Sequence, residues 1–321
     1  MSDKPKLKLW SHISDIHKAG IAYMEDRRDG IVKSIATPWK KFNDAGIGGL
    51  EWGTINTIGG RPGSGKTLIV NQITRQAHSL NKDQDFCVLD FQFEMSNKTT
   101  AVREFSSIVR KTYKELVSVD RRIDDSDINI IKTYISKGEH KEIYQVDMSM
   151  TVDQMKETIL LFLHEKGKPT IITIDHSVLI KKDATEKDKF EMLYNLGEMM
   201  TELKRAYPVI FIVLTQMNRS IEAQERKIPG TVGNYPTTAD VFGADALLQH
   251  SDLMVAINKP SEYYLDIYGP EQYIVDEKTL ALHFVKARNG DRSICFFEAQ
   301  FEHMSIKEMG IPATKKVKLR T

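Results

Sequence analysis

Cysteine is scarce in this chain, which limits the kinds of site it can build. Only Cys87 and Cys295 occur in 321 residues, and both lie in apolar runs, DFCVLDF and SICFFEA, that are typical of core strands. We therefore expect buried, reduced thiols and no disulfide framework. The spacing of Cys and His suggests no metal site, and the expected compartment is a reducing cytosol.

Long apolar runs and an excess of one charge are also missing. No window approaches the roughly 18 to 20 apolar residues of a membrane span, and the basic N-terminus MSDKPKLKLW lacks the apolar stretch of a secretory signal. The 45 Lys and Arg residues against 44 Asp and Glu residues leave a formal net charge of +1. Any contact with nucleic acid must therefore come from local basic patches.

Strands and helices alternate from about residue 50 onward. Continuous apolar strands between helices predict an α/β fold, with a mostly parallel central sheet flanked by helices on both faces and an antiparallel edge. The predicted strands are residues 54–60, 85–93, 143–147, 170–175, 209–216, 253–257, 280–288 and 293–301, and the predicted helices are residues 66–80, 97–117, 151–166 and 187–206.

Three segments fall outside this alternation. Residues 10–30 carry apolar side chains at helical spacing, which predicts an amphipathic helix that docks on its own domain or on a neighbouring subunit. Residues 217–242 are rich in Gly, Pro, Asn and Thr and predict a long mobile loop. We divide the chain into an N-terminal segment, 1–35, a P-loop ATPase domain, 36–306, and a basic tail, 307–321, that is a solvated terminus or a contact for nucleic acid or a partner.

The stretch GRPGSGKT matches the pattern of a phosphate-binding loop in full, between a predicted strand and a predicted helix. Glycines let backbone N–H groups approach a phosphate, Lys66 would reach the outer phosphates, and Thr67 would hold Mg²⁺. The predicted ligand is a nucleoside triphosphate, ATP with Mg²⁺. The residues predicted to bind it are Gly60, Arg61, Pro62, Gly63, Ser64, Gly65, Lys66 and Thr67.

Carboxylates follow two of the predicted strands. Asp175 ends the apolar run TIITID, where a strand meets the ligand crevice, and could complete the Mg²⁺ shell begun by Thr67. Hydrolysis also needs a group that activates water. Glu94 lies just beyond a strand and Asp90 lies within it, and the phosphate loop alone does not say which one acts.

Five motifs in order resemble the DnaB-like replicative helicases. They are FQFEMS, the segment from IYQVD to TIITIDH, VIFIVLTQMNRSIEAQERK, ADALLQHSDLMVAI and LHFVKARNG. The Asp175–His176 pair is closer to the helicase half of phage primase-helicases. The resemblance covers about residues 36–305. It implies a RecA-like motor domain of a hexameric ring that unwinds DNA, in the cytosol of a bacterium or of a phage-infected host.

The resemblance also implies roles for particular residues. Glu94 would be the catalytic base, and Asp175 the carboxylate on the metal side. Gln216 would sense the γ-phosphate and pass its state to the following loop. Lys286 and Arg288 would reach the ATP of the neighbouring subunit, Arg288 as an arginine finger. Both point to the same side of one strand, and surface salt bridges are the alternative for them.

Contacts with single-stranded DNA are expected in the 217–242 region, where the chain departs from the family. Phe242 replaces an Arg that relatives use to grip the DNA backbone, and Ala287 replaces the middle residue of the KQR motif. Phe242 could stack on a base or fold inward. Arg219, Arg226 and Lys227 are the other candidate DNA contacts.

The implied partners are identical subunits, single-stranded DNA, and a primase or helicase loader. About fifty residues precede the motor, without the family's collar domain, so we expect the helix of residues 10–30 to supply ring cohesion. A RecA-like recombinase or DNA-repair ATPase, and an ATP-gated helicase loader or scaffold, remain as alternatives. KARNG fits a helicase better than a recombinase.

Overall fold

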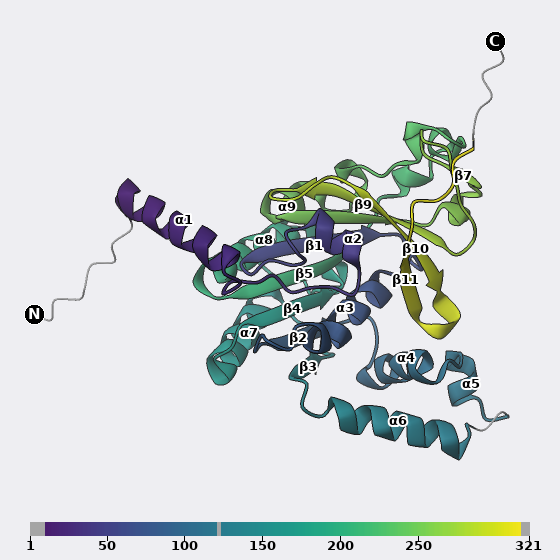
Figure 1. The fold of residues 1–321 in the computed structure, drawn as a ribbon, viewed down its shortest axis with the longest axis horizontal. Helices are drawn as coiled ribbons and strands as arrows, with labels where there is room; N and C mark the ends of the chain where they lie inside the picture. The colour runs from purple at the N-terminus through teal and green to yellow at the C-terminus, as the bar shows by residue number, and fades with distance from the viewer. Residues whose placement is uncertain (1–9, 121–122, 316–321) are drawn as a thin grey trace, which may run out of the picture. The chain divides into compact units, whose positions relative to one another are not determined.

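The computed structural model describes residues 10–120 and 123–315, which Figure 1 draws in colour. The chain divides into two units, Met1–Ser34 and Ile35–Thr321. The first unit holds helix α1 (Ile13–Arg28), which lies within the predicted helix and has no buried residue. None of the helices in the described part of the chain has the length and hydropathy of a membrane span.

The second unit is built on one nine-stranded sheet. The order of its strands is β11-β10-β9-β6-β1-β5-β4-β2-β3. From β3 to β6 neighbouring strands are parallel, and β9, β10 and β11 add an antiparallel edge. The strands are β1 (Thr54–Gly60), β2 (Cys87–Gln92), β3 (Ile143–Val146), β4 (Thr170–Asp175), β5 (Val209–Gln216), β6 (Leu253–Asn258), β9 (Thr279–Ala287), β10 (Ile294–Gln300) and β11 (Ser305–Met309). The predicted α/β fold with a mostly parallel sheet is confirmed.

Helices cover both faces of this sheet (Figure 1). Those on one face are α2 (Lys40–Ala45) and α3 (Lys66–Leu80), and those on the other are α7 (Val152–Lys166), α8 (Lys189–Ala206) and α9 (Ala244–His250). Helices α4 (Asn97–Val109), α5 (Tyr113–Val117) and α6 (Asp125–Gly138) pack mainly on one another, to one side of the sheet. A two-stranded sheet of β7 (Ile267–Tyr268) and β8 (Tyr273–Ile274) lies apart from the main one.

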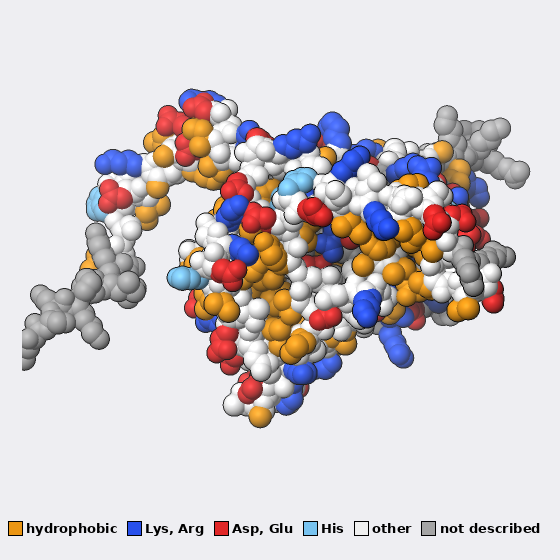
Figure 2. Space-filling model, turned by 90° about the horizontal axis from the view of Figure 1, so that it is seen from below, with side chains coloured by type: hydrophobic (Ala, Val, Ile, Leu, Met, Phe, Trp, Pro, Cys, Tyr) orange, Lys and Arg blue, Asp and Glu red, His pale blue; other side chains and the backbone are white. Residues whose placement is uncertain are grey.

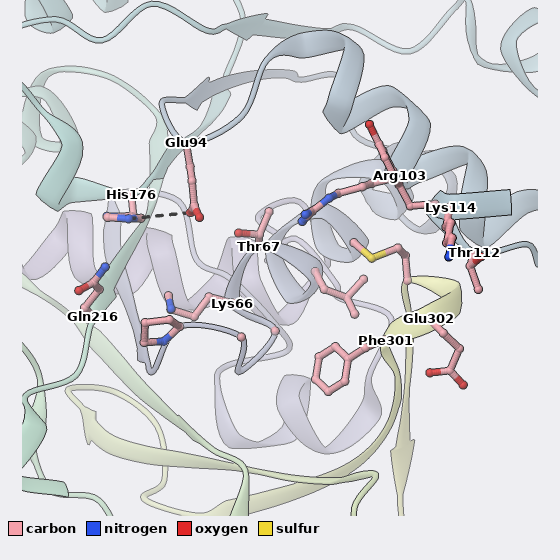
Figure 3. A pocket seen from close by; sticks show the side chains of 16 residues that line it. Lys66, Thr67, Glu94, Arg103, Thr112, Lys114, His176, Gln216, Phe301 and Glu302 are labelled. Carbon is pink, nitrogen blue, oxygen red and sulfur yellow. Dashed lines mark ion pairs between the residues drawn. The ribbon is translucent and has the colours of Figure 1, made fainter. Parts of the chain in front are cut away.

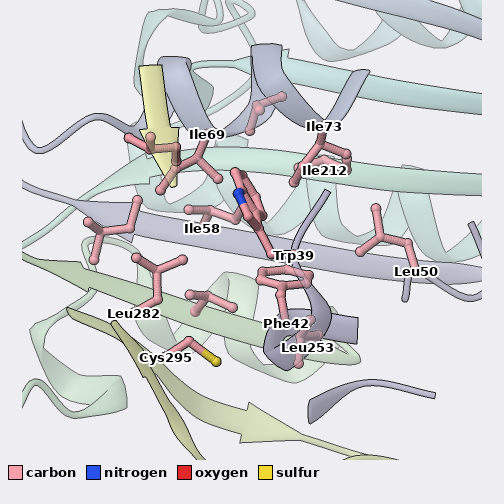
Figure 4. Close-up of a cluster of buried hydrophobic side chains, with 14 of the residues drawn as sticks. Trp39, Phe42, Leu50, Ile58, Ile69, Ile73, Ile212, Leu253, Leu282 and Cys295 are labelled. Carbon is pink, nitrogen blue, oxygen red and sulfur yellow. The ribbon is translucent and has the colours of Figure 1, made fainter. Parts of the chain in front are cut away.

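Alternation along the strands divides the core into two layers. On β5, Ile210 and Ile212 face the layer of α2 and α3, whereas Phe211 and Val213 face that of α7, α8 and α9. This period of two puts successive side chains on opposite faces, so a strand that is apolar throughout is covered on both sides. Figure 4 shows Trp39 among the side chains of the first layer. Cys87 and Cys295 are buried and free, as predicted.

Several elements differ from the prediction. The helix predicted over 97–117 is two helices, because Arg110 adopts a left-handed conformation (φ 54°) between α4 and α5. Helices α2, α6 and α9 and strands β7, β8 and β11 were not predicted. β11 carries the sheet past the predicted domain boundary at residue 306. Residues 316–321 of the predicted basic tail lie outside the described residues.

The segment of residues 217–242, predicted as a mobile loop, is built of short 3-10 turns held by side chains. The turns are Arg219–Glu222, Gln224–Lys227, Val232–Asn234 and Thr238–Asp240. Asn234 donates to the carbonyls of Arg226 and Ile228, at 2.9 and 2.8 Å. We call this segment the excursion, because its ends pair with each other between Met217 and Val241. Sequence periodicity could not detect an order that comes from side chains binding backbone carbonyls.

Candidate nucleotide site

The phosphate loop connects the end of β1 to the start of α3. Gly63 and Gly65 have φ values of +78° and +89°, a region that favours glycine. A Cβ atom on Gly60 would lie 2.4 Å from the Ser64 hydroxyl and 3.1 Å from Lys66 Cγ. The loop is therefore wrapped tightly in front of the N-terminus of α3, where backbone N–H groups and the helix dipole favour an anion.

Lys66 is buried at the base of this loop. Its Nζ donates to the carbonyls of Gly60 and Arg61, both at 2.9 Å. Burial lowers the pKa of Lys66, while the carboxylates of Asp175 and Glu94 work against that shift. The amine thus faces two acidic side chains from other strands, which the sequence predicted would meet at this edge of the sheet.

Asp175 ends β4 with only 1% of its surface exposed. Neither of its carboxylate oxygens has a hydrogen-bond partner within the described residues. Burial raises the pKa of Asp175 to about 6, and the neighbouring Thr67 hydroxyl and Lys66 oppose this shift. A buried carboxylate without a partner is costly unless a cation binds it.

These oxygen donors fit Mg²⁺, which prefers carboxylate, hydroxyl and phosphate oxygens and keeps several waters. No cluster of three or more His, Cys, Asp or Glu side chains in the described ranges could hold a metal without other ligands. Thr67 and Asp175 would therefore share the ion with the phosphates of a nucleotide.

Glu94, His176 and Gln216 surround the same space (Figure 3). Glu94 follows β2, and its Oε2 lies 3.9 Å from Nε2 of His176. Burial lowers the pKa of His176, so the neutral imidazole faces Glu94. Gln216 ends β5. The carboxyl ends of three neighbouring parallel strands thus bring these side chains together with Lys66.

The cavity has a volume of about 600 Å³ and is completed by residues that the sequence did not predict. One wall comes from α4, α5 and the turn between them, and another from the turn between β10 and β11. These residues, besides His176, are Arg103, Thr112, Tyr113, Lys114, Phe301, Glu302 and Met304. Arg103 and Lys114 have no ion-pair partner within the described ranges, so two more cations are available to a polyphosphate.

The ring of Phe301 lies against the phosphate loop. A Cβ atom on Gly65 would come within 2.9 Å of its ring, and Lys259 Nζ lies 5.0 Å from the ring centroid. The ring could support the base of a nucleotide whose phosphates lie in the loop. Its only signal in the sequence was its place as the last residue of the strand predicted over 293–301, which ends one residue earlier in the structure.

Not every residue of the phosphate loop faces the cavity. Pro62, Gly63, Gly65, Lys66 and Thr67 line it, whereas Gly60, Arg61 and Ser64 do not. The guanidinium of Arg61 forms an ion pair with Glu222 of the excursion. Its backbone carbonyl accepts from Lys66, while its side chain is directed to Glu222.

Lys286 and Arg288 lie on β9 and just after it, away from the cavity of their own chain. Arg288 donates to Asp252 Oδ1 and to the carbonyl of Gln249, both at 3.0 Å. Lys286 Nζ donates to the carbonyl of Leu248. The structure does not bring these cations to the same-chain Lys66, so any action on a nucleotide would have to be on that of another copy.

The candidate DNA contacts fall into two groups. Arg219 is exposed and has no partner within the described ranges, and Lys227 is half-buried. Phe242 is half-buried too, and its ring packs against that of Phe190 with centroids 5.5 Å apart, so it folds inward.

Arg226 was predicted as a DNA contact, but its guanidinium is bonded within the chain. Its guanidinium donates to both carboxylate oxygens of Asp240, at 3.2 and 3.0 Å, and to the carbonyls of Gly233 and Tyr235. These bonds use its donors within the chain because Asp240, which is 3% exposed, needs a partner.

Comparison with known proteins identifies the family. Residues 34–307 match the family described as the DnaB-like helicase C terminal domain. The chain belongs to this family. The resemblance predicted from five ordered motifs is thereby confirmed over most of the DnaB-like chain.

Among curated relatives, the replicative DNA helicase DnaB of Helicobacter pylori is 24% identical over 242 residues, covering 75% of this chain and 47% of the relative. The protein of the same name from Buchnera aphidicola is 24% identical over 261 residues, covering 77% of this chain and 54% of the relative. The DnaB-like chain thus spans about half the length of these relatives.

Solved structures confirm the RecA-like fold. A solved ATPase domain aligns with a TM-score of 0.76 and 16% identity, covering 92% of this chain and 99% of that one. A DnaB-like replicative helicase, solved in a study of its interactions with primase, aligns with a TM-score of 0.74 and 15% identity, covering 90% and 65% of the two chains.

Proposed function

We propose that this chain is an ATP-dependent DNA helicase, a ring-forming motor that translocates on single-stranded DNA and unwinds duplex during replication. The observation that carries the proposal is the meeting of Lys66, Thr67, Glu94 and Gln216 around one cavity in a chain of the DnaB-like family. Asp175 is buried beside Thr67 and Lys66, just behind the lining of that cavity. The cytosol of a bacterium or of a phage-infected host is the proposed location.

ATP would bind with its phosphates in the loop. Backbone N–H groups of the loop and the amine of Lys66 hold the β- and γ-phosphates, and Thr67 and Asp175 hold Mg²⁺. The ion neutralises charge that develops on the phosphates as the bond breaks. Arg103 and Lys114 support the polyphosphate from the other wall.

Glu94 is the proposed catalytic base. Its side chain is 55% exposed and lines the cavity, so a water could reach both the carboxylate and a γ-phosphate. The carboxylate accepts a proton from that water while the water oxygen attacks the γ-phosphorus. The bond from the γ-phosphorus to the bridging oxygen breaks, and ADP leaves with that oxygen. The neutral ring of His176 limits the positions that Glu94 can take.

The cations of the cleavage step would come from a second copy of the chain. Arg288 is half-exposed, and together with Lys286 it lies outside its own cavity, as a role at a neighbour's nucleotide requires. We propose a homo-oligomer, a hexameric ring, with α1 packing on the adjacent copy. Deleting residues 1–34 and finding ring assembly unchanged by mass measurement would reject that role of α1.

The excursion is the proposed contact for single-stranded DNA. Gln216 ends β5 at the cavity, and its carbonyl accepts from the Phe242 N–H at the far end of the excursion, at 2.8 Å. Both ends of the excursion are thus held next to Gln216, the proposed sensor of the γ-phosphate. Arg219 and Lys227 are the proposed phosphate contacts, and a primase or helicase loader is the proposed further partner.

Unwinding of forked DNA by the purified chain, beside its Glu94→Gln variant, tests the proposal. Strand separation that needs ATP and is lost in the variant supports a helicase. ATP hydrolysis without strand separation would favour a loader or scaffold. Filaments in place of closed rings in negative-stain images would favour the recombinase alternative.

A further inference from the structure

An ion pair connects the phosphate loop to the excursion. The guanidinium of Arg61, the second residue of the loop, pairs with the carboxylate of Glu222, the last residue of the turn Arg219–Glu222. Both side chains are partly shielded from solvent, at 23% and 39% exposed. The pair lies outside the nucleotide cavity and has no part in the chemistry proposed above.

The Arg61 end of the pair is sensitive to what Lys66 binds. Lys66 Nζ donates to the carbonyl of Arg61 at 2.9 Å. A phosphate oxygen that accepts from the same amine competes with this carbonyl, so phosphate binding changes the restraint on the backbone of Arg61. The positive charge of Arg61 also acts on Lys66, whose pKa it helps to lower.

A second acidic side chain lies near Arg61 but has its own cation. Glu262 Oε1 is 3.7 Å from Lys259 Nζ. Burial raises the pKa of Glu262, and Lys259 opposes that shift more strongly than Arg61 does. Glu222 is therefore the principal partner of Arg61.

The Glu222 end belongs to a short rigid piece of the excursion. Ile221 is buried in the cluster formed with Tyr263 and Tyr268, and the Ala223 N–H donates to the carbonyl of Ser220 at 3.1 Å. Arg219, three residues before Glu222, is exposed. A displacement of Glu222 must therefore move the turn that carries Arg219.

We propose that Arg61 and Glu222 are a positioning pair that transmits the state of the phosphate loop to the turn Arg219–Glu222, and so to the bound nucleic acid. This route is separate from the backbone connection through Gln216. The inference rests on the proposed function, because that function makes the excursion the contact for single-stranded DNA.

The test uses the full chain with Glu222→Gln and, as a matched control, Glu225→Gln. Glu225 is an exposed carboxylate of the same segment without an ion-pair partner in the described ranges. The affinity for a fluorescein-labelled oligothymidylate is measured with and without ATPγS, together with basal and DNA-stimulated ATP hydrolysis. Hydrogen exchange of residues 218–223 with and without ATPγS is measured in the absence of DNA.

The pair predicts that Glu222→Gln leaves basal hydrolysis unchanged. In the wild type, the affinity for the oligothymidylate with ATPγS differs from the affinity without it. In Glu222→Gln the ratio of these two affinities should move towards one by about fivefold or more, within the usual range of coupling between sites. The effect of ATPγS on exchange at residues 218–223 should disappear. Glu225→Gln should behave as the wild type in every measurement, and Arg61→Gln added to Glu222→Gln should reduce the ratio no further.

Two results would overturn the inference. One is a Glu222→Gln variant with wild-type coupling and exchange, and the other is a parallel loss of nucleotide affinity and basal hydrolysis, which would make the pair a mere support of the loop. The wild type could fail to bind the oligothymidylate while Glu222→Gln abolishes the effect of ATPγS on hydrogen exchange at residues 218–223. In that case the proposed function fails and the positioning pair stands.

Discussion

Arg288 is held at 3.0 Å by Asp252, a carboxylate that also accepts from Lys204 and from the backbone N–H of Ile55. Asp252 is thus tied to α8 and to the central strand β1, and it fixes Arg288 just beyond the end of β9. The Arg288 side chain remains 49% exposed. An arginine held by a rigid support and turned towards solvent is preorganised for a ligand of another copy.

Arg288→Ala should therefore lose hydrolysis without losing nucleotide. If Arg288 acts as the proposed arginine finger, ATP turnover should fall by about a thousandfold or more. Binding of a fluorescent ATP analogue should be unchanged, because Arg288 does not line the cavity of its own chain. Arg292→Ala, which removes an exposed arginine from the adjacent turn, is the control and should keep full activity.

Mixing variants tests whether Arg288 acts between copies. Lys66→Ala removes the phosphate contact from one copy, and Arg288→Ala removes the finger from another. If copies assemble in the proposed ring, some interfaces of a mixture join an intact Lys66 to an intact Arg288, so a mixture of the two inactive variants should regain hydrolysis. Two variants that stay inactive after mixing, while rings still form, would contradict action in trans.

Glu94→Gln separates binding from chemistry. The amide keeps the shape of the side chain but cannot take a proton, so hydrolysis should fall by roughly a hundredfold to ten-thousandfold. Nucleotide affinity should be kept, and single-turnover quenching with equilibrium binding would measure the two effects. Glu302→Gln, another carboxylate that lines the cavity, should hydrolyse ATP normally. An equal loss of ATP hydrolysis in Glu94→Gln and Glu302→Gln would contradict a specific role of Glu94 as the catalytic base.

Much of the sheet could be predicted because its signal is local. The run VIFIVLTQ opens with six apolar residues, and TINTIGG leads directly into the phosphate loop; they became β5 and β1 with the predicted bounds. Helix α3 also matched its predicted bounds, because a phosphate loop fixes its start. Helix α6 was not predicted, and only Asp127 and Ile131 of its 14 residues are buried, so it adds little to the core.

Some residues of the candidate site could be predicted from the sequence, and others could not. Asp175, Glu94 and Gln216 could be placed at one edge because parallel strands end there together. The wall formed by Arg103 and Lys114 could not be predicted, because it depends on how α4 and α5 turn back towards the loop. The role of Arg226 depends on Asp240, fourteen residues away, which no periodic pattern marks.

Arg226 and Arg219 should now respond differently to substitution. Arg226→Met leaves the buried carboxylate of Asp240 unpaired, so we expect a loss of about 3 to 5 kcal/mol in the free energy of unfolding. Arg219→Met should change it by less than about 0.5 kcal/mol and should weaken binding to an oligothymidylate. Denaturant unfolding and a DNA titration measure the two effects.

A second substitution checks the cause of the Arg226 effect. Adding Asp240→Asn to Arg226→Met removes the unpaired charge and should recover part of the lost stability. An Arg226→Met protein as stable as the wild type, with reduced DNA affinity, would restore Arg226 as a DNA contact.

His283 should give the protein a defined sensitivity to acid. Its Nε2 lies 2.6 Å from the hydroxyl of Tyr268, which belongs to the buried cluster of Ile221 and Tyr263, and burial lowers the pKa of His283 to about 3. The unfolded histidine titrates near pH 6.5, so from about pH 6.5 down towards 3 only the unfolded chain gains this proton. The free energy of unfolding should therefore fall on acidification through this window, by about 1.4 kcal/mol per pH unit from this residue alone.

Urea unfolding at several pH values should give a shallower pH dependence of the unfolding free energy for His283→Gln than for the wild type. His164→Gln, at an exposed histidine, is the control and should keep the wild-type slope. Equal slopes for His283→Gln and the wild type would mean that His283 is protonated in the folded core.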